Sequence, residues 1–218
     1  MTLAMSSSTD LAALISAIET ADSKAGIVQA VRALAAAQDP EAIPMLIKVL
    51  GYNNPGAAVA ATDGLVDLGE AAVPALLEQI DGYNYGARAW AIRALSLIQD
   101  PRALPVLLDA TREDFALSVR RAAAKGLGTL NWSKLPPDEV ETAQSEAATT
   151  LVEALQDPEW VVRYSAVVGL QALASAMVQS DSFEQIVTQV QQVAAQDPVS
   201  AVQARAQMGL DILAEGSS

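Results

Sequence analysis

A run of small and branched residues ending in leucine recurs along the chain, and it constrains the fold more than any other feature. The copies read AGIVQAVRAL, GAAVAATDGL, GARAWAIRAL, SVRRAAAKGL, VVRYSAVVGL and AVQARAQMGL. They end at Leu34, Leu65, Leu95, Leu127, Leu170 and Leu210, at steps of 31, 30, 32, 43 and 40 residues. A period of this length is typical of helical repeats that stack and share one core.

The segments between these copies predict a second helix in each repeat. PEAIPMLIKVLG, EAAVPALLEQID and PRALPVLLDAT carry Pro44, Pro74 and Pro105 at matching early positions, where a helix tolerates proline. Apolar residues then follow at helical spacing. The sequence therefore predicts an all-α fold, an α-solenoid of about six helix pairs that resembles HEAT repeats. We expect one domain over residues 10–215, after a flexible N-terminus at residues 1–9.

The longer later steps reflect an insertion, NWSKLPPDEVETAQSEAATT. Its two prolines break the chain, and the acidic residues that follow suit the first turn of a helix. We expect this helix to be an elongated first helix of the fifth pair, ending at about Leu155.

Charge and composition exclude several classes of function. With 26 acidic and 13 basic residues, the net charge of −13 repels phosphate backbones, so nucleic acid is not an expected partner. The chain contains no cysteine and no histidine, which removes thiol nucleophiles, the usual zinc ligands and imidazole bases. No metal site is expected. No signal peptide or apolar run of membrane-spanning length is evident, so we expect a soluble, intracellular protein without membrane insertion.

Three arginines share one repeat position, seven residues before the terminal leucine: Arg88, Arg120 and Arg163. Ala58 and Gln203 occupy the matching position in two other repeats. Such an arginine can pair with a carboxylate of the next helix pair, which is a structural role, or it can bind a ligand on the concave face expected for second helices. The sequence leaves both alternatives open.

Aromatic residues make up only 4% of the chain, yet they gather around these arginines. Tyr83, Tyr85 and Trp90 surround Arg88 in sequence, and Trp160 and Tyr164 flank Arg163. Aromatic faces stack on planar groups and arginine binds carboxylates through two hydrogen bonds, so the set suits a planar conjugated ligand with acidic tails. The alternative is that Trp90 and Trp160 only fill gaps in the solenoid.

The turn GYNNPG at residues 51–56 is nearly repeated by DGYNYG at residues 81–86. Glycine and asparagine allow the backbone angles of a tight corner between helices. That explanation does not cover the tyrosines or the near-identity of the copies. We therefore predict a recognition surface here, with Tyr52, Asn53 and Asn54 as contacts to a partner.

Four segments resemble the F subunit of the E/F-type phycobilin lyases of cyanobacteria and red algae, over roughly residues 10–215: GYNNPGAAVAA, QIDGYNYGARAWAIRAL, DFALSVRRAAAKGLGTLNW and DPEWVVRYSAVVGLQALA. The resemblance implies an enzyme subunit that works as a heterodimer with an E-type subunit in the cytosol near phycobilisomes. The pair would attach phycocyanobilin to a cysteine of the phycocyanin α subunit through a thioether, and could also detach it. Phycocyanobilin is then the substrate, and no tightly bound cofactor is expected.

The resemblance also suggests roles for residues. Tyr83, Tyr85, Arg88, Trp90, Arg120, Trp160, Arg163 and Tyr164 are the expected bilin contacts, with the arginines on the two propionates. Asp81 and Asp114 precede second helices and are the candidates to hold the pyrrole nitrogens protonated. A related F subunit that isomerises the bilin resembles this chain but carries a His-Cys pair in the turn equivalent to residues 83–88. This chain lacks both residue types, so we expect addition without isomerisation.

Two other classes remain open on the sequence. A non-enzymatic HEAT-like adaptor of phycobilisome degradation is similar to these lyases and would bind phycobiliproteins without forming a bond. A general scaffold with no pigment role is the third possibility.

Overall fold

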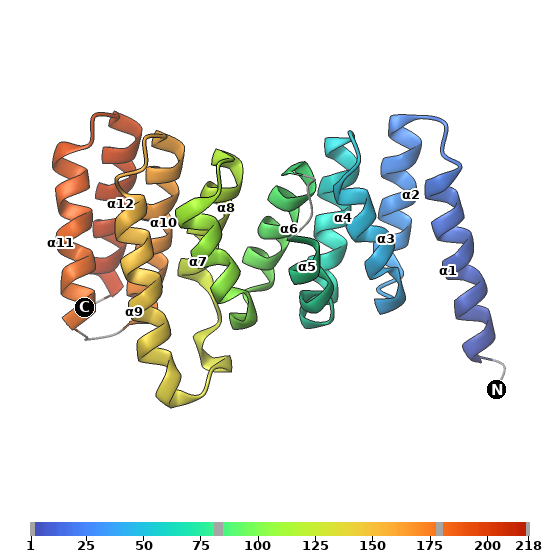
Figure 1. The fold of residues 1–218 in the computed structure, drawn as a ribbon, viewed down its shortest axis with the longest axis horizontal. Coiled ribbons are helices and arrows are strands. Elements are labelled where there is room, and N and C mark those ends of the chain that lie inside the picture. The colour runs from blue at the N-terminus through green and yellow to red at the C-terminus, as the bar shows by residue number, and fades with distance from the viewer. Residues whose placement is uncertain (1–2, 81–84, 178–180, 217–218) are drawn as a thin grey trace. The chain divides into compact units, whose positions relative to one another are not determined.

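The computed structural model of the chain describes residues 3–80, 85–177 and 181–216. Within them, twelve α-helices form six successive pairs, and no strand occurs (Figure 1). The helices are α1 (Leu3–Glu19), α2 (Lys24–Ala36), α3 (Ile43–Leu50), α4 (Pro55–Leu68), α5 (Val73–Ile80), α6 (Tyr85–Ile98), α7 (Leu104–Glu113), α8 (Leu117–Thr129), α9 (Pro137–Ala154), α10 (Trp160–Ala176), α11 (Asp181–Gln196) and α12 (Ser200–Gly216). The predicted all-α fold of helix pairs is confirmed.

Local sequence explains where these helices begin. Pro44 and Pro105 lie in the first turn of α3 and α7, where the missing backbone donor is not needed. Asp39 and Asp100 cap the short 3₁₀ turns before those helices, each accepting a hydrogen bond from the backbone N–H two residues later. The elongated first helix predicted for the fifth pair is α9, which starts at Pro137.

The chain divides into two compact units, residues 1–98 and 99–218, and each is described by itself. In the first unit, α2 packs on α4, and α4 packs on α6. In the second unit, α8, α10 and α12 form one layer, while α7, α9 and α11 form the other. Helix α1 begins at Leu3, so it includes residues 3–9, and the flexibility expected of residues 1–9 stays a prediction.

The repeat leucines form the core of both units. Leu34, Leu65, Leu95, Leu127 and Leu170 are fully buried, and each contributes about 2 kcal/mol through the apolar surface that it removes from water. Leu210 is only half-buried, and it belongs to α12, in the last helix pair of the chain. The repeat in the sequence therefore corresponds to the repeat in helix packing.

No helix among the described residues is long and apolar enough to cross a membrane. Those residues also contain no cluster of acidic side chains able to hold a metal ion.

Candidate functional site

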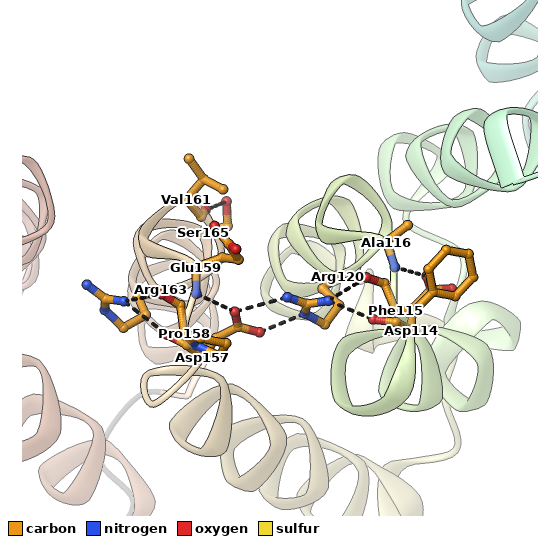
Figure 2. A network of polar contacts seen from close by, with 10 residues as sticks. All are labelled: Asp114, Phe115, Ala116, Arg120, Asp157, Pro158, Glu159, Val161, Arg163 and Ser165. Atoms are coloured by element: carbon orange, nitrogen blue, oxygen red, sulfur yellow. Dashed lines mark hydrogen bonds and ion pairs between the residues drawn. The ribbon is translucent and has the colours of Figure 1, made fainter.

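A charged ladder runs along one end of the second-helix layer in the second unit (Figure 2). Arg120, in the first turns of α8, donates to Asp157 through Nε at 2.7 Å from Oδ2 and through Nη2 at 3.1 Å from Oδ1. Its remaining nitrogen, Nη1, donates to the backbone carbonyls of Asp114 and Phe115 at 2.8 and 3.1 Å. All three guanidinium nitrogens are therefore engaged within the protein.

The same arrangement repeats one helix pair later. Arg163, on α10, donates to Asp197 at 2.7 Å through Nε and at 3.0 Å through Nη2. Its Nη1 donates to the Asp157 carbonyl at 3.0 Å. The side chains of Arg163 and Asp197 are only 11% and 4% exposed, so water screens this ion pair little.

The aspartates of the ladder also start the helices that follow them. Oδ1 of Asp157 accepts a hydrogen bond from the Glu159 N–H at 2.8 Å, and Asp197 accepts one from Val199 at the same distance. Each of these two carboxylates thus caps a turn and receives an arginine from the preceding helix pair. This arrangement, which we call the ladder module, therefore links the turn before one helix to the helix pair that precedes it.

Hydrogen bonding sets the protonation states in the ladder. The hydrogen bonds from Arg163 lower the pKa of Asp197 and outweigh the opposing effect of burial. The same bonds raise the pKa of Arg163, and Asp157 raises that of Arg120 in the same way. Arg120 and Arg163 are therefore fixed, charged structural groups, and their geometry favours the structural alternative over a direct bond to a ligand.

Gln203 accounts for the exception that the sequence showed at this repeat position. Its Nε2 donates to the Asp197 carbonyl at 2.8 Å, the contact that Nη1 makes in Arg120 and Arg163. The shorter amide keeps the local contact and omits the fork that would bind a carboxylate of another helix pair. Gln203 lies on α12, the last helix of the chain, where the ladder ends.

The two predicted catalytic aspartates differ in what the structure describes. Asp81 lies outside the described residues. Asp114 is half-buried, and its Oδ1 accepts the Ala116 N–H at 2.8 Å, as in the ladder module. Its register matches that of Asp157 and Asp197, thirteen residues before the repeat leucine. Asp114 therefore has a structural role, whatever further role it holds.

The aromatic residues predicted on α10 lie on its exposed face. The Trp160 side chain is 44% exposed and that of Tyr164, one turn later, is 36% exposed. Leu117 occupies on α8 the repeat position of Trp160 and is 42% exposed. Exposed aromatic faces one turn apart on α10 fit a binding surface better than gap filling.

Two glycines hold α8 and α10 together and fix their register. A methyl group added at Gly128 would overlap the carbonyl group of Gly169, and one added at Gly169 would overlap the carbonyl oxygen of Ala124. Gly169 therefore lies against α8 between Ala124 and Gly128, which places residues of equal repeat position at about the same height on the two helices. Tyr164 and Arg121, each six residues before its repeat leucine, are then level with each other.

Arg121 is an exposed cation on α8 that the sequence reasoning did not single out. Its side chain forms no hydrogen bond or ion pair with any described residue. The available signal was its repeat position, which it shares with Tyr164.

Predicted residues in the first unit show mixed environments. Arg88 and Trp90 are half-buried on α6. Tyr83 lies outside the described residues, and nothing is described of the Tyr85 side chain. They stay predictions, as does the role of Tyr52, which is half-buried, and of Asn53, which is exposed.

Asn54 does not fit the partner contact predicted for it. It is 7% exposed, and its amide is used inside the first unit. Nδ2 donates to the Lys24 carbonyl at 3.0 Å, while Oδ1 accepts the Ala57 N–H at 3.3 Å and caps α4. This asparagine links the start of α4 to the start of α2, which explains why asparagine occupies the turn before α4.

A groove of about 410 Å³ opens beside the ladder, on the side of α11. Glutamine side chains and aliphatic groups line most of it, including Gln189, Gln192 and Val193. Among the described residues that line it, the charged ones are Asp157, Arg163 and Asp197. Asp157 is paired with Arg120, and Arg163 is paired with Asp197.

Comparison with known proteins first defines the class. Models of HEAT repeats match residues 11–83, 59–128 and 149–177, and the model described as PBS lyase HEAT-like repeat matches residues 119–157. The chain is thus a HEAT-repeat protein.

Relatives define the family within this class. The chain is 62% identical to "Phycocyanin alpha phycocyanobilin lyase CpcF" of Synechocystis sp. over 74% of its length and 75% of that protein. It is 53% identical to "Phycocyanobilin lyase subunit beta" of Nostoc sp., covering 88% of the chain and 94% of the relative. A chain of the solved complex of CpcE and CpcF of phycocyanin lyase from Nostoc sp. matches with a TM-score of 0.74 and 54% identity, over 78% of this chain and 99% of that one. The chain belongs to the family of CpcF-type phycocyanobilin lyase subunits.

Proposed function

We propose that this protein is the F subunit of a heterodimeric bilin lyase that attaches phycocyanobilin to a cysteine of the phycocyanin α subunit. The proposal rests on the match to a chain of the solved CpcE–CpcF complex. That chain is 54% identical to this protein and is covered over 99% of its length. The partner is then an E-type subunit. The cyanobacterial relatives support work in the cytosol beside the phycobilisomes.

The composition supports chemistry in which the substrate protein brings the nucleophile. The chain has no cysteine and no histidine, so neither a thiol nor an imidazole base comes from it. Attachment is an addition: the substrate thiol forms a carbon–sulfur bond at the ethylidene group, its proton ends on the neighbouring ring carbon, and no group leaves. Detachment is the reverse elimination on the same surface. The lyase contributes by holding a flexible tetrapyrrole in one reactive conformation.

The exposed face of the second helices supplies groups for this task. Trp160 and Tyr164 offer aromatic faces one turn apart on α10, and a conjugated tetrapyrrole can stack on them. Arg88 and Trp90 on α6 are proposed as further contacts. Asp81 and Asp114 remain the proposed carboxylates for the pyrrole nitrogens, and Asp114→Asn should change the absorption spectrum of bound bilin if that role is right.

We further propose that the addition occurs without isomerisation. The His-Cys pair of the isomerising relative has no counterpart anywhere in this sequence. The adduct should therefore keep the red absorption of phycocyanobilin. A shift of the product to shorter wavelength would contradict this part of the proposal.

One reconstitution tests the function. The chain is produced together with an E-type subunit, phycocyanobilin and apo-α-phycocyanin, and a covalent red-absorbing adduct is sought on a denaturing gel. An adduct that needs both subunits supports the lyase. Tight binding of α-phycocyanin without an adduct would support the degradation adaptor instead, which the lyase names of the relatives disfavour.

Arg88→Lys tests the third arginine at this repeat position, whose role the ladder contacts do not assign. Lysine keeps the charge and loses the planar fork, so bilin binding should weaken by about 1–3 kcal/mol if Arg88 binds a propionate through two bonds. Reduced stability with unchanged transfer per folded molecule would give Arg88 the structural role that Arg120 and Arg163 have.

A further inference from the structure

The basic residues of the second unit divide sharply by whether they have a partner inside the protein. Eight arginines and lysines lie in residues 99–218. Four form ion pairs, namely Arg102, Arg112, Arg120 and Arg163. Buried Arg205 donates to Gln171 at 2.8 Å, and Lys134 lies close enough to Asp100 to lower the pKa of that carboxyl group.

The other two are Arg121 and Lys125. Both are exposed, and neither side chain forms a hydrogen bond or ion pair with any described residue. They lie four residues apart on α8, one above the other on the same face. Like charges at this spacing destabilise a helix by roughly 0.2–0.5 kcal/mol, and no acidic neighbour offsets that cost here. In a chain with twice as many acidic as basic residues, such a pair calls for a ligand.

The neighbouring helix fixes what kind of ligand this is. Gly169 packs against α8 between Ala124 and Gly128, so Arg121 is level with Tyr164 and Lys125 is level with Val168 on α10. Exposed Trp160 continues the aromatic strip one turn earlier. Two cations one helical turn apart beside two aromatic faces are complementary to a planar conjugated molecule that carries two carboxylates.

We infer that Arg121 and Lys125 bind the two propionates of the bilin, while Trp160 and Tyr164 stack on its rings. This inference rests on the proposed lyase function and places both propionates on these two exposed residues in place of Arg88, Arg120 and Arg163. Arg120 holds the α8–α10 stack through Asp157, and Arg121 faces outward. Adjacent arginines thus have separate tasks.

The test uses the heterodimer with the E-type subunit and compares phycocyanobilin with its dimethyl ester, in which both carboxylates are blocked. Binding is followed by absorption titration for the wild type, for Arg121→Gln/Lys125→Gln, and for Arg112→Gln. The last variant is the control because Arg112 lies on α7, in the other helix layer, and pairs with Glu153.

We expect the wild type and the control to prefer the free acid over the ester, and the double variant to lose that preference. The loss should be about five- to twentyfold, since one exposed charge contact contributes up to roughly fivefold. Affinity for the ester should stay unchanged.

Two results would overturn the inference. The double variant could keep the full preference for the acid, or the wild type could bind acid and ester equally. If the double variant keeps that preference but no longer associates with apo-α-phycocyanin or the E-type subunit in gel filtration, these cations form a protein-docking surface. A wild-type heterodimer that binds no bilin and forms no adduct would refute the proposed function itself.

Discussion

The α2–α4 and α8–α10 contacts join equivalent helices of successive pairs, yet they use different chemistry. Between α2 and α4, a neutral side chain makes the link: Asn54 caps α4 and donates to the Lys24 carbonyl at 3.0 Å. Between α8 and the turn before α10, the link is the ion pair of Arg120 and Asp157 at 2.7 Å. Both links are largely buried, so each must satisfy its polar groups internally.

The helix backbones also meet differently at the two contacts. Gly64 on α4 faces the side chain of Ala35, whose Cβ would lie 2.6 Å from an added methyl group. Gly128 on α8 instead faces the backbone of Gly169. The Cβ of alanine moves only with its own backbone, so both contacts resist an added methyl group, and the overlap is deeper at Gly128. The α8–α10 contact therefore relies on charge and backbone contact, and the α2–α4 contact on a neutral amide and small residues.

The largest expected effect comes from removing half of a ladder ion pair. Arg163→Ala leaves the carboxylate of Asp197, 4% exposed, without its partner, and should lower the free energy of unfolding by about 3–5 kcal/mol. Urea denaturation measures this. Arg112→Ala is the control: its pair with Glu153 is far more exposed and should cost less than about 1 kcal/mol. Equal losses would show that burial of the ladder has no energetic consequence.

The glycine contacts give the next effect. Gly128→Ala should lower the free energy of unfolding by about 3 kcal/mol, because the new methyl group overlaps a backbone carbonyl group. Gly64→Ala should cost about 1–2 kcal/mol, because the overlap of the new methyl group with the Ala35 Cβ, at 2.6 Å, is shallower than the overlap at Gly128. Thermal melts of both variants test the difference. The reverse order would contradict the deeper overlap at Gly128.

Asn54→Ala probes the neutral link. The change removes a helix cap and leaves the Lys24 carbonyl without its side-chain donor, so the expected loss is about 1–2 kcal/mol. Asn54→Asp keeps the cap and should recover part of this loss. A loss as large as that of Arg163→Ala would mean that the two contacts are not energetically distinct.

Acid should weaken the charged contact only at low pH. Hydrogen bonds from Arg163 hold the pKa of Asp197 below its ordinary value, so this carboxylate contributes stability above about pH 4. The contribution is lost as the pH falls from there through the lowered pKa, because the unfolded chain takes up the proton first. Urea denaturation at pH 7 and pH 3 should show a smaller pH dependence for Asp197→Asn than for the wild type. An unchanged dependence would exclude Asp197 as its source.

Much of this protein could be predicted from the sequence. The spacing of Leu34, Leu65 and Leu95 specifies a buried stripe on each second helix, and a stripe that recurs at about 30 residues requires neighbours to cover it. The paired helices and the long α9 follow from such local patterns and from proline and cap positions. The absence of cysteine and histidine fixed which chemistry the chain cannot perform.

The tertiary structure decided which side chains are available for binding. Arg120 and Arg121 are adjacent in sequence and identical in type, but a helix rotates by about 100° per residue, so one reaches Asp157 and the other faces solvent. Asp157 lies 37 residues away, and only the stacking of α8 on α10 brings it to Arg120. Asn54 likewise became structural through Lys24, 30 residues earlier. Local patterns cannot reveal such partners, because they are set by the register between helices that are distant in sequence.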